Sequence, residues 1–274
     1  MELAAVPRVL LTVAGFDPSS GAGITADLAV FTAFGAFGVS CITAITVQST
    51  VGVEAVEPVG MVAETIAALD ADFTLAGVKI GMLATAENAR ALDAFLSGFC
   101  PVKHGQNVVL DPVMRSSSGR ELLEPEGEAV LREKLLGRVG WITPNLDELG
   151  RLIGTEVKSA GEVPAAALRL RAMAAELGNK ELRVVVTGGH LENGSADDYL
   201  LDSDGREYWV RGERIETRAT HGTGCAFSSA LLAGGVTRPE RSAVEQVRAA
   251  KEFVRRAMET AAPLGRGNGP MNLR

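Results

Sequence analysis

The chain has 274 residues, 46% of them hydrophobic and 22% charged, which is typical of a globular protein with one large α/β domain or two small ones. A net charge of −7 without any lysine- and arginine-rich run argues against a nucleic-acid-binding protein, and three widely spaced cysteines argue against a disulfide scaffold or a structural zinc site. No apolar stretch approaches the roughly 18 residues that span a bilayer, and residues 1–8 lack the features of an export signal, so we expect a cytoplasmic protein without membrane contact.

Segments that predict strands alternate with segments that predict helices along the chain. Apolar and β-branched runs predict strands at residues 9–14, 38–47, 77–80, 107–111, 139–143 and 183–187. Helical patterns occupy residues 23–33, 61–70, 86–95, 126–136, 146–153, 163–177, 226–233 and 243–261. Residues 197–214 predict a polar hairpin. This order predicts an α/β fold in which a mostly parallel, doubly wound sheet carries helices on both faces, as one three-layer domain over residues 1–274.

Ligands of such sheets bind beyond the carboxyl ends of the strands, so the polar residues at those ends are candidates for a site. These residues are Asp17, Gln48, Lys79, Asp111, Asn145, Thr187 and His190.

The segment 220–228 (THGTGCAFS) is the most informative of these regions. Two glycines flank a threonine just before a predicted helix, an arrangement that can direct several backbone N–H groups at one anion. The same positive field would lower the pKa of Cys225 and favour its thiolate. The alternative is an ordinary glycine-rich turn that ends in a buried cysteine.

The loop at residues 14–27 (AGFDPSSGAGITAD) contains Gly21-x-Gly23-x-x-Ala26, which matches the dinucleotide-binding pattern G-x-G-x-x-G/A. The glycines begin seven residues after the predicted strand, however, and no acidic residue lies between Leu28 and Val53 to bind a ribose. A loop that shapes a substrate pocket is therefore favoured over a flexible loop and over dinucleotide binding.

Four polar residues each allow a structural and a functional interpretation. Asp111 either fixes its own turn or lies near a metal or phosphate. Asn145 and Glu148 have the spacing of a helix capping box, which we favour, although the same groups could hold waters bound to Mg²⁺. Gln48 either ends a strand or pairs with the edge of a heteroaromatic ring.

Together these segments resemble one family. The matching pieces run in family order from residue 9 to about 270 and are the loop 14–27, Gln48 after residues 42–44, residues 79–83 (KIGML), 111–114 (DPVM), 143–148 (TPNLDE), 188–190 (GGH) and 221–225 (HGTGC). The chain resembles the hydroxymethylpyrimidine/phosphomethylpyrimidine kinases of thiamine biosynthesis, within the ribokinase-like superfamily.

The resemblance implies a site and a reaction. ATP with Mg²⁺ would phosphorylate 4-amino-5-hydroxymethyl-2-methylpyrimidine and then its monophosphate, in a protein that is often a homodimer. The pyrimidine would meet Gly15, Asp27, Gln48, Met82 and Val113. The nucleotide would lie near Asp111, Asn145, Glu148, Thr187, Gly189 and Thr223, with Asp111 and Glu148 beside the metal. The turn of Gly222, Thr223, Gly224 and Cys225 would form the anion hole, with Cys225 as the proton acceptor.

One position departs from the family pattern. Thr187 stands where the family usually has a lysine, so a hydroxyl replaces a full positive charge near the phosphates. This departure leaves the second phosphorylation and the substrate preference open. A pyridoxal kinase of the same superfamily is the nearest alternative. A NAD(P)-binding oxidoreductase and a non-catalytic ligand sensor are alternatives of other classes.

Overall fold

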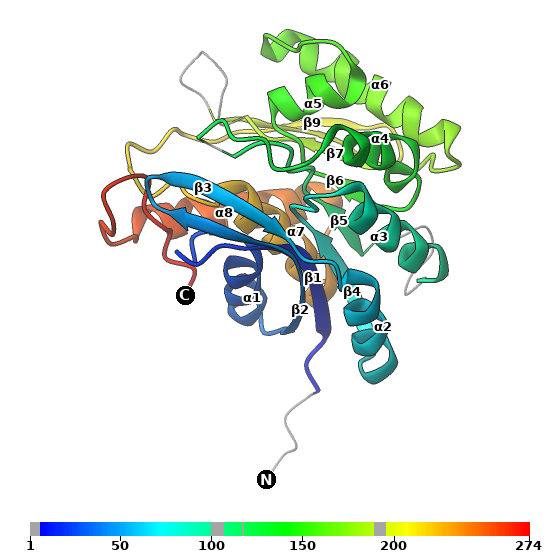
Figure 1. Ribbon diagram of the computed structural model, residues 1–274. Coiled ribbons are helices and arrows are strands. Elements are labelled where there is room, and N and C mark those ends of the chain that lie inside the picture. The colour runs from blue at the N-terminus through cyan, green and yellow to red at the C-terminus, as the bar shows by residue number, and fades with distance from the viewer. Residues whose placement is uncertain (1–5, 100–106, 117, 189–195) are drawn as a thin grey trace.

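The computed structural model describes residues 6–99, 107–116, 118–188 and 196–274. Its centre is a nine-stranded sheet in the order β3-β2-β1-β4-β5-β6-β7-β8-β9 (Figure 1). The strands are β1 (Val9–Phe16), β2 (Phe37–Ser49), β3 (Gly52–Pro58), β4 (Leu75–Ile80), β5 (Val108–Leu110), β6 (Trp141–Ile142), β7 (Arg183–Val186), β8 (Asp198–Leu201) and β9 (Glu207–Val210). The six strands from β2 to β7 in this order pair in parallel, and antiparallel pairing adds β3 at one edge and β8 and β9 at the other.

Helices cover both faces of the sheet (Figure 1). One face carries α1 (Gly23–Ala33), α7 (Thr223–Thr237) and α8 (Ala243–Glu259). The other carries α2 (Val62–Asp72), α3 (Ala86–Gly98), α4 (Pro125–Glu133), α5 (Leu146–Ile153) and α6 (Val163–Glu176). Within the described residues, no helix combines the length and the apolar character needed to cross a bilayer.

Each face of the sheet has its own hydrophobic core because successive side chains of a strand point to opposite faces. In β1, Leu10 packs with the α1, α7 and α8 side, whereas Leu11 packs with the α2 to α6 side. In β5, Val109 belongs to the first core, and Val108 and Leu110 belong to the second. Burial on both faces explains why these strands are almost continuously apolar.

The three-layer α/β fold is confirmed. The predicted bounds of α1 and α5 match the structure, whereas α7 begins at Thr223 rather than at Ala226. Sequence patterns missed β3, a mostly exposed edge strand whose two glutamates interrupt its apolar residues. One sheet runs through the described residues, and the single-domain organisation stays a prediction.

Candidate active site

A cavity of about 350 Å³ lies at the carboxyl ends of the parallel strands and the start of α7. Residues that follow six strands converge on it, as the topology predicts. The predicted site residues that line this cavity are Gly15, Gln48, Met82, Asp111, Val113, Asn145, Glu148, Thr187, Gly222, Thr223, Gly224 and Cys225.

The two glycine-rich segments of the sequence interlock at this cavity. Gly222 has a left-handed φ of 79°, and a Cβ at this position would clash with the carbonyl oxygen of Gly21. A Cβ at Gly21 would in turn clash with the ring of His221, and one at Gly23 with the carbonyl oxygen of Gly15. The glycines therefore permit a close approach of two backbone segments about 200 residues apart in sequence.

The first turn of α7 faces this cavity with its backbone N–H groups available. Gly222 is the N-cap residue, and it has no side chain that could cap the helix. The first four N–H groups of a helix have no partner within the helix, and the helix dipole adds partial positive charge there. This end of α7 is therefore suited to an anion such as a transferring phosphoryl group.

The thiol of Cys225 lies in this first turn, and its expected low pKa is wrong. Burial, together with the charges of Asp111 and Asp27, raises the pKa of Cys225 to about 12, against the opposing effects of Lys79 and a backbone hydrogen bond from Gly23. Loss of solvation and two carboxylates outweigh the positive charge of Lys79. In the free protein at neutral pH, Cys225 is therefore a neutral thiol.

Asp111 and Glu148 place two buried carboxyl groups in the same cavity. Burial raises the pKa of Asp111, although Lys79 opposes this, and the hydroxyl of Ser228 donates to Asp111 Oδ2 over 3.2 Å. Burial and the charge of Asp111 raise the pKa of Glu148 to about 8. Like charges in one buried site disfavour ionisation unless a cation balances them. No group of three or more metal-binding side chains occurs in the described part of the chain.

Asn145 and Glu148 form the capping box that the sequence predicts. Asn145 Oδ1 accepts from the Glu148 N–H over 2.9 Å, and Glu148 Oε2 accepts from the Asn145 N–H over 2.9 Å. The structural interpretation is thus confirmed for both residues, and both still line the cavity.

Asp27 requires a correction, because it does not line the cavity as a substrate ligand would. Its side chain is fully buried, and Oδ2 accepts from Thr12 over 2.6 Å and from Lys79 over 3.0 Å. Oδ1 accepts from Ser229 over 2.7 Å. Burial lowers the pKa of Lys79, but the Asp27 carboxylate offsets this and the net shift is upward. Asp27 therefore links α1, β1, β4 and α7 beneath the site.

Asp17, His221 and Gln48 form a hydrogen-bonded group on the cavity wall. His221 Nε2 lies 2.7 Å from Asp17 Oδ2 and 3.0 Å from the amide nitrogen of Gln48. Asp17 also accepts from the N–H of Ala22, next to the start of α1, over 3.0 Å. A carboxylate of the chain itself thus sits where a dinucleotide pyrophosphate would bind, which argues against dinucleotide binding by this loop.

Comparison with known proteins identifies the family. The family described as Phosphomethylpyrimidine kinase matches residues 17–272. The chain belongs to this family. A hydroxymethylpyrimidine/phosphomethylpyrimidine kinase of Aquifex aeolicus is 38% identical over 262 residues, which cover 94% of this chain and 97% of the relative.

Two solved structures are similar over most of the chain. The phosphomethylpyrimidine kinase of Clostridium difficile has a TM-score of 0.74 at 32% identity and covers 90% of this chain and 98% of its own. The pyridoxal kinase of Bacillus subtilis, solved as an ADP complex, has a TM-score of 0.80 at 33% identity and covers 97% of each chain. The chain is therefore a small-molecule kinase that uses ATP.

Of two residues predicted to contact the nucleotide, the structure describes one, Thr187, but not the other, Gly189. Thr187 lines the cavity of this phosphomethylpyrimidine kinase family member, and its backbone N–H donates to the carbonyl of Pro144 over 3.0 Å. Gly189, together with His190, lies outside the described residues. Its predicted contact with the nucleotide stays a prediction.

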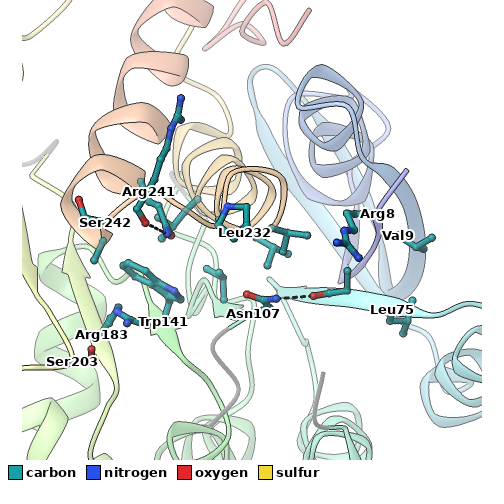
Figure 2. Close-up of a pocket in the computed structure, with 18 of the residues that line it drawn as sticks. Arg8, Val9, Leu75, Asn107, Trp141, Arg183, Ser203, Leu232, Arg241 and Ser242 are labelled. Carbon is teal, nitrogen blue, oxygen red and sulfur yellow. Dashed lines mark hydrogen bonds between the residues drawn. The ribbon is translucent and has the colours of Figure 1, made fainter. Parts of the chain in front are cut away.

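A larger cavity, of about 1070 Å³, lies at the amino ends of the strands, and no predicted site residue lines it (Figure 2). Its polar groups are largely paired with one another. Arg183 forms an ion pair with Asp202 and lies 4.9 Å from the Trp141 ring centroid, and the amide of Asn107 donates to the carbonyl of Ala76. Size alone would favour this cavity, but the convergent polar groups of the candidate site lie at the other edge of the sheet.

Sequence reasoning includes Asp17 among the polar residues at the strand ends without a role, and it gives His221 only an unspecific part in shaping the site. The signal was present, because both are polar, both adjoin glycine-rich segments and Asp17 follows a strand. What the sequence lacks is the pairing of two residues 204 positions apart.

Proposed function

We propose that this kinase phosphorylates the hydroxymethyl group of 4-amino-5-hydroxymethyl-2-methylpyrimidine and then the resulting monophosphate. One juxtaposition carries the proposal: the uncapped start of α7, with Cys225, shares a cavity with the Gln48 amide. An amide can pair with the amino group and the neighbouring ring nitrogen of an aminopyrimidine. The name of the Aquifex aeolicus relative supports the same substrate and its phosphate.

The residues present fit ATP with Mg²⁺. Among the described residues, Asp17, Asp27, Asp111 and Glu148 are buried acidic residues near the site, whereas Lys79 is the only buried lysine or arginine. A divalent cation would balance the excess negative charge, and Mg²⁺ characteristically takes one or two carboxylates and keeps several waters. We assign its carboxylate contacts to Asp111 and Glu148, with Asn145, Thr187 and Gly189 on the nucleotide side. When bound, Mg²⁺ neutralises phosphate charge.

The chain supplies orientation and charge stabilisation for the transfer. Phosphoryl transfer passes through a loose transition state whose charge lies on the phosphoryl oxygens. The N–H groups of Thr223, Gly224 and Cys225 would donate to these oxygens without rearrangement, since α7 already holds them in place. Gly15, Met82 and Val113 would enclose the pyrimidine ring.

Cys225 is our proposed proton acceptor, and its neutral resting state adds a condition. The thiol must lose its own proton as it accepts that of the hydroxymethyl group. Asp111, which accepts a hydrogen bond from Cys225, can take the thiol proton on one carboxylate oxygen while the other would contact Mg²⁺. One proton moves from the alcohol oxygen to Sγ and one from Sγ to a carboxylate oxygen, so the charge balances.

A coupled ATP-consumption assay tests the function. The substrates are the pyrimidine alcohol, its monophosphate and pyridoxal, and product masses separate the monophosphate from the diphosphate. We expect both pyrimidines to be substrates. Preference for pyridoxal by more than about tenfold in kcat/KM, some 1.4 kcal/mol, would overturn the proposal in favour of a vitamin B6 kinase. Similarity to the Bacillus subtilis pyridoxal kinase makes this the second candidate.

Assembly and location are also proposals. Ile45, Val47 and Val51 of the β2–β3 hairpin region are 50%, 57% and 70% exposed, and such apolar side chains favour a homodimer contact. We propose a cytoplasmic homodimer that does not bind nucleic acid, in keeping with its net charge of −7. Light scattering of the wild type and of an Ile45→Glu/Val47→Glu variant tests the dimer, which the double substitution should dissociate.

A further inference from the structure

We propose that the Asp17–His221 pair determines substrate specificity by fixing which end of the Gln48 amide accepts and which end donates. This inference rests on the proposed function, since it concerns how the same cavity reads the ring of its substrate. It makes Asp17 and His221 positioning residues that act through Gln48.

The first step is to establish whether the Nε2 atom of His221 carries a hydrogen. Although burial raises the pKa of Asp17, hydrogen bonds from His221 and Ser19 bring it below the usual range. Asp17 is thus a carboxylate, which only accepts hydrogen bonds. It accepts from the Ser19 N–H over 2.8 Å, from the Ser19 hydroxyl over 2.7 Å and from His221 Nε2 over 2.7 Å. His221 Nε2 must therefore carry a proton.

The second step is the orientation of Gln48. The Nε2 atom of His221, which carries a hydrogen, lies 3.0 Å from the amide nitrogen of Gln48. Two hydrogen-bond donors would therefore face each other. At the other end, the Thr46 hydroxyl has one proton but two acceptors, Gln48 Oε1 at 3.1 Å and the Phe16 carbonyl at 3.0 Å. Turning the amide by 180°, a change that leaves its shape almost unaltered, removes the contact between two donors and the competition at Thr46. Oε1 then shares the single Nε2 proton of His221 with Asp17 Oδ2 in a three-centre hydrogen bond, and Nε2 donates to Thr46.

The third step is the rigidity of the pair. The side chains of His221 and Asp17 are only 12% and 4% exposed. The His221 ring packs against Gly21, which has no side chain. The backbone N–H of His221 donates to the Gly269 carbonyl over 3.2 Å. The pair is thus held in place from the β1–α1 loop and the start of α7 before a ligand arrives.

The consequence concerns the ligand's donor and acceptor order. With Oε1 toward His221, Gln48 retains one acceptor site on the oxygen and one N–H, in a fixed order along the cavity wall. An exocyclic amine next to a ring nitrogen matches that order, because the amine donates and the ring nitrogen accepts. A hydroxypyridine such as pyridoxal lacks this pair of neighbouring groups. A site built to hydrogen-bond a group rejects an analogue without it, because the site's own groups stay unpaired.

The test compares His221→Phe and Asp17→Asn with Ser19→Ala. Phenylalanine keeps a ring against Gly21 but removes the N–H, and the asparagine side chain keeps the shape of the aspartate but no longer requires a donor. Ser19→Ala removes a different hydrogen bond to Asp17 and leaves His221 untouched, so it is the matched control. We measure kcat/KM for the pyrimidine alcohol and for pyridoxal, and KM for ATP.

We expect His221→Phe and Asp17→Asn to lower the pyrimidine-to-pyridoxal ratio by roughly tenfold to a hundredfold, the range of one to two hydrogen bonds. The KM for ATP should stay within about twofold, and Ser19→Ala should keep the wild-type ratio. Equal losses for both substrates, or an unchanged ratio in both test variants, would overturn the proposal. If His221→Phe fails to fold, Asp17→Asn decides.

A second measurement does not depend on catalysis. The ¹⁵N spectrum of histidine-labelled protein, which has three histidines, should show a proton on Nε2 of His221, and Nε2 without a proton would overturn the proposal. If the wild type does not phosphorylate the pyrimidine, the proposed function fails. In that case, calorimetry measures the affinities of the same variants for the pyrimidine and for pyridoxal. The pyrimidine-to-pyridoxal ratio of these affinities then decides the role of the Asp17–His221 pair.

Discussion

Two helices, α5 and α7, begin at the same cavity, but they differ in how the N–H groups of their first turns are satisfied. At α5, the side chains of Asn145 and Glu148 satisfy the first N–H groups in a closed capping box. At α7, Gly222 provides no capping side chain, and the first turn stays available. Both helix starts line the candidate site, so position alone does not distinguish their roles. Their roles are distinguished by whether the first N–H groups already have hydrogen-bond partners within the protein.

The difference has an energetic reason. A capping box stabilises the folded protein by satisfying donors internally, typically by about 1 kcal/mol. An uncapped start leaves this stabilisation to a ligand, and the left-handed Gly222 makes a tight turn there without a side chain. We infer that α5 contributes mainly stability and α7 mainly charge stabilisation of the transferred group. The substitutions below test this division, from the largest expected effect to the smallest.

Gly222→Ala should have the largest effect. Its Cβ would clash with the Gly21 carbonyl in a left-handed backbone conformation that itself costs about 1–2 kcal/mol. We expect kcat to fall by about 10²–10³, the loss seen when a transition-state donor is misplaced. Gly154→Ala is the control, since Gly154 also has a positive φ but open space around its Cβ. Steady-state kinetics that show the same kcat for both variants would remove the special role of α7.

Cys225→Ala should lower kcat by about 10²–10⁴ with little change in the KM for ATP, if the thiol accepts the alcohol proton. Near-normal turnover with saturating ATP and pyrimidine would exclude that role. Cys41→Ala is the matched control, because Cys41 is a buried cysteine whose pKa burial raises to about 11, and it lies in the core outside the cavity. It should lose some stability and no kcat.

The same two helices show what sequence can reveal. The bounds of α5 are predictable because its cap lies within four residues of sequence, from Asn145 to Glu148. The start of α7 is predicted three residues late, because threonine and glycine are poor helix formers and the N-cap role of Gly222 comes from its contact with Gly21. Most predicted site residues do reach one cavity, since parallel strands bring their carboxyl ends together.

Effects that arise from residues distant in the chain could not be predicted from sequence patterns. The helix dipole at Cys225 is local and predictable, whereas its burial and the charges of Asp111 and Asp27 depend on the fold. Asp27 matches a family motif, yet its partners Thr12, Lys79 and Ser229 lie 15, 52 and 202 residues away. Sequence patterns therefore predict which residues gather better than they predict which of them stay solvated.

Glu148→Gln separates the charge of α5's cap from its hydrogen bonds. The amide oxygen of glutamine can still accept from the Asn145 N–H, but the buried charge is gone. With a folded-state pKa of about 8 against an ordinary 4.5, Glu148 binds a proton more readily in the folded protein, so stability falls as pH rises from about 5 to 8. In protein freed of divalent cations, thermal unfolding of Glu148→Gln should lose much of that fall. Asp147→Asn, at an exposed neighbour, should keep most of the fall, because Asp147 raises the Glu148 pKa less than burial and Asp111 do. Identical pH profiles for Glu148→Gln and wild type would contradict the buried charge.

Asn145→Ala should have the smallest effect and bears most directly on the comparison. It removes the acceptor for the Glu148 N–H, which should cost about 1 kcal/mol of unfolding free energy, as loss of a helix cap does. If α5 contributes mainly stability, kcat should fall much less than in Gly222→Ala, and denaturant unfolding with parallel kinetics measures both. A kcat loss as large as that of Gly222→Ala, with full stability, would reverse the division. Asn145 would then act on the nucleotide, and the capping box would be the secondary role of a catalytic helix start.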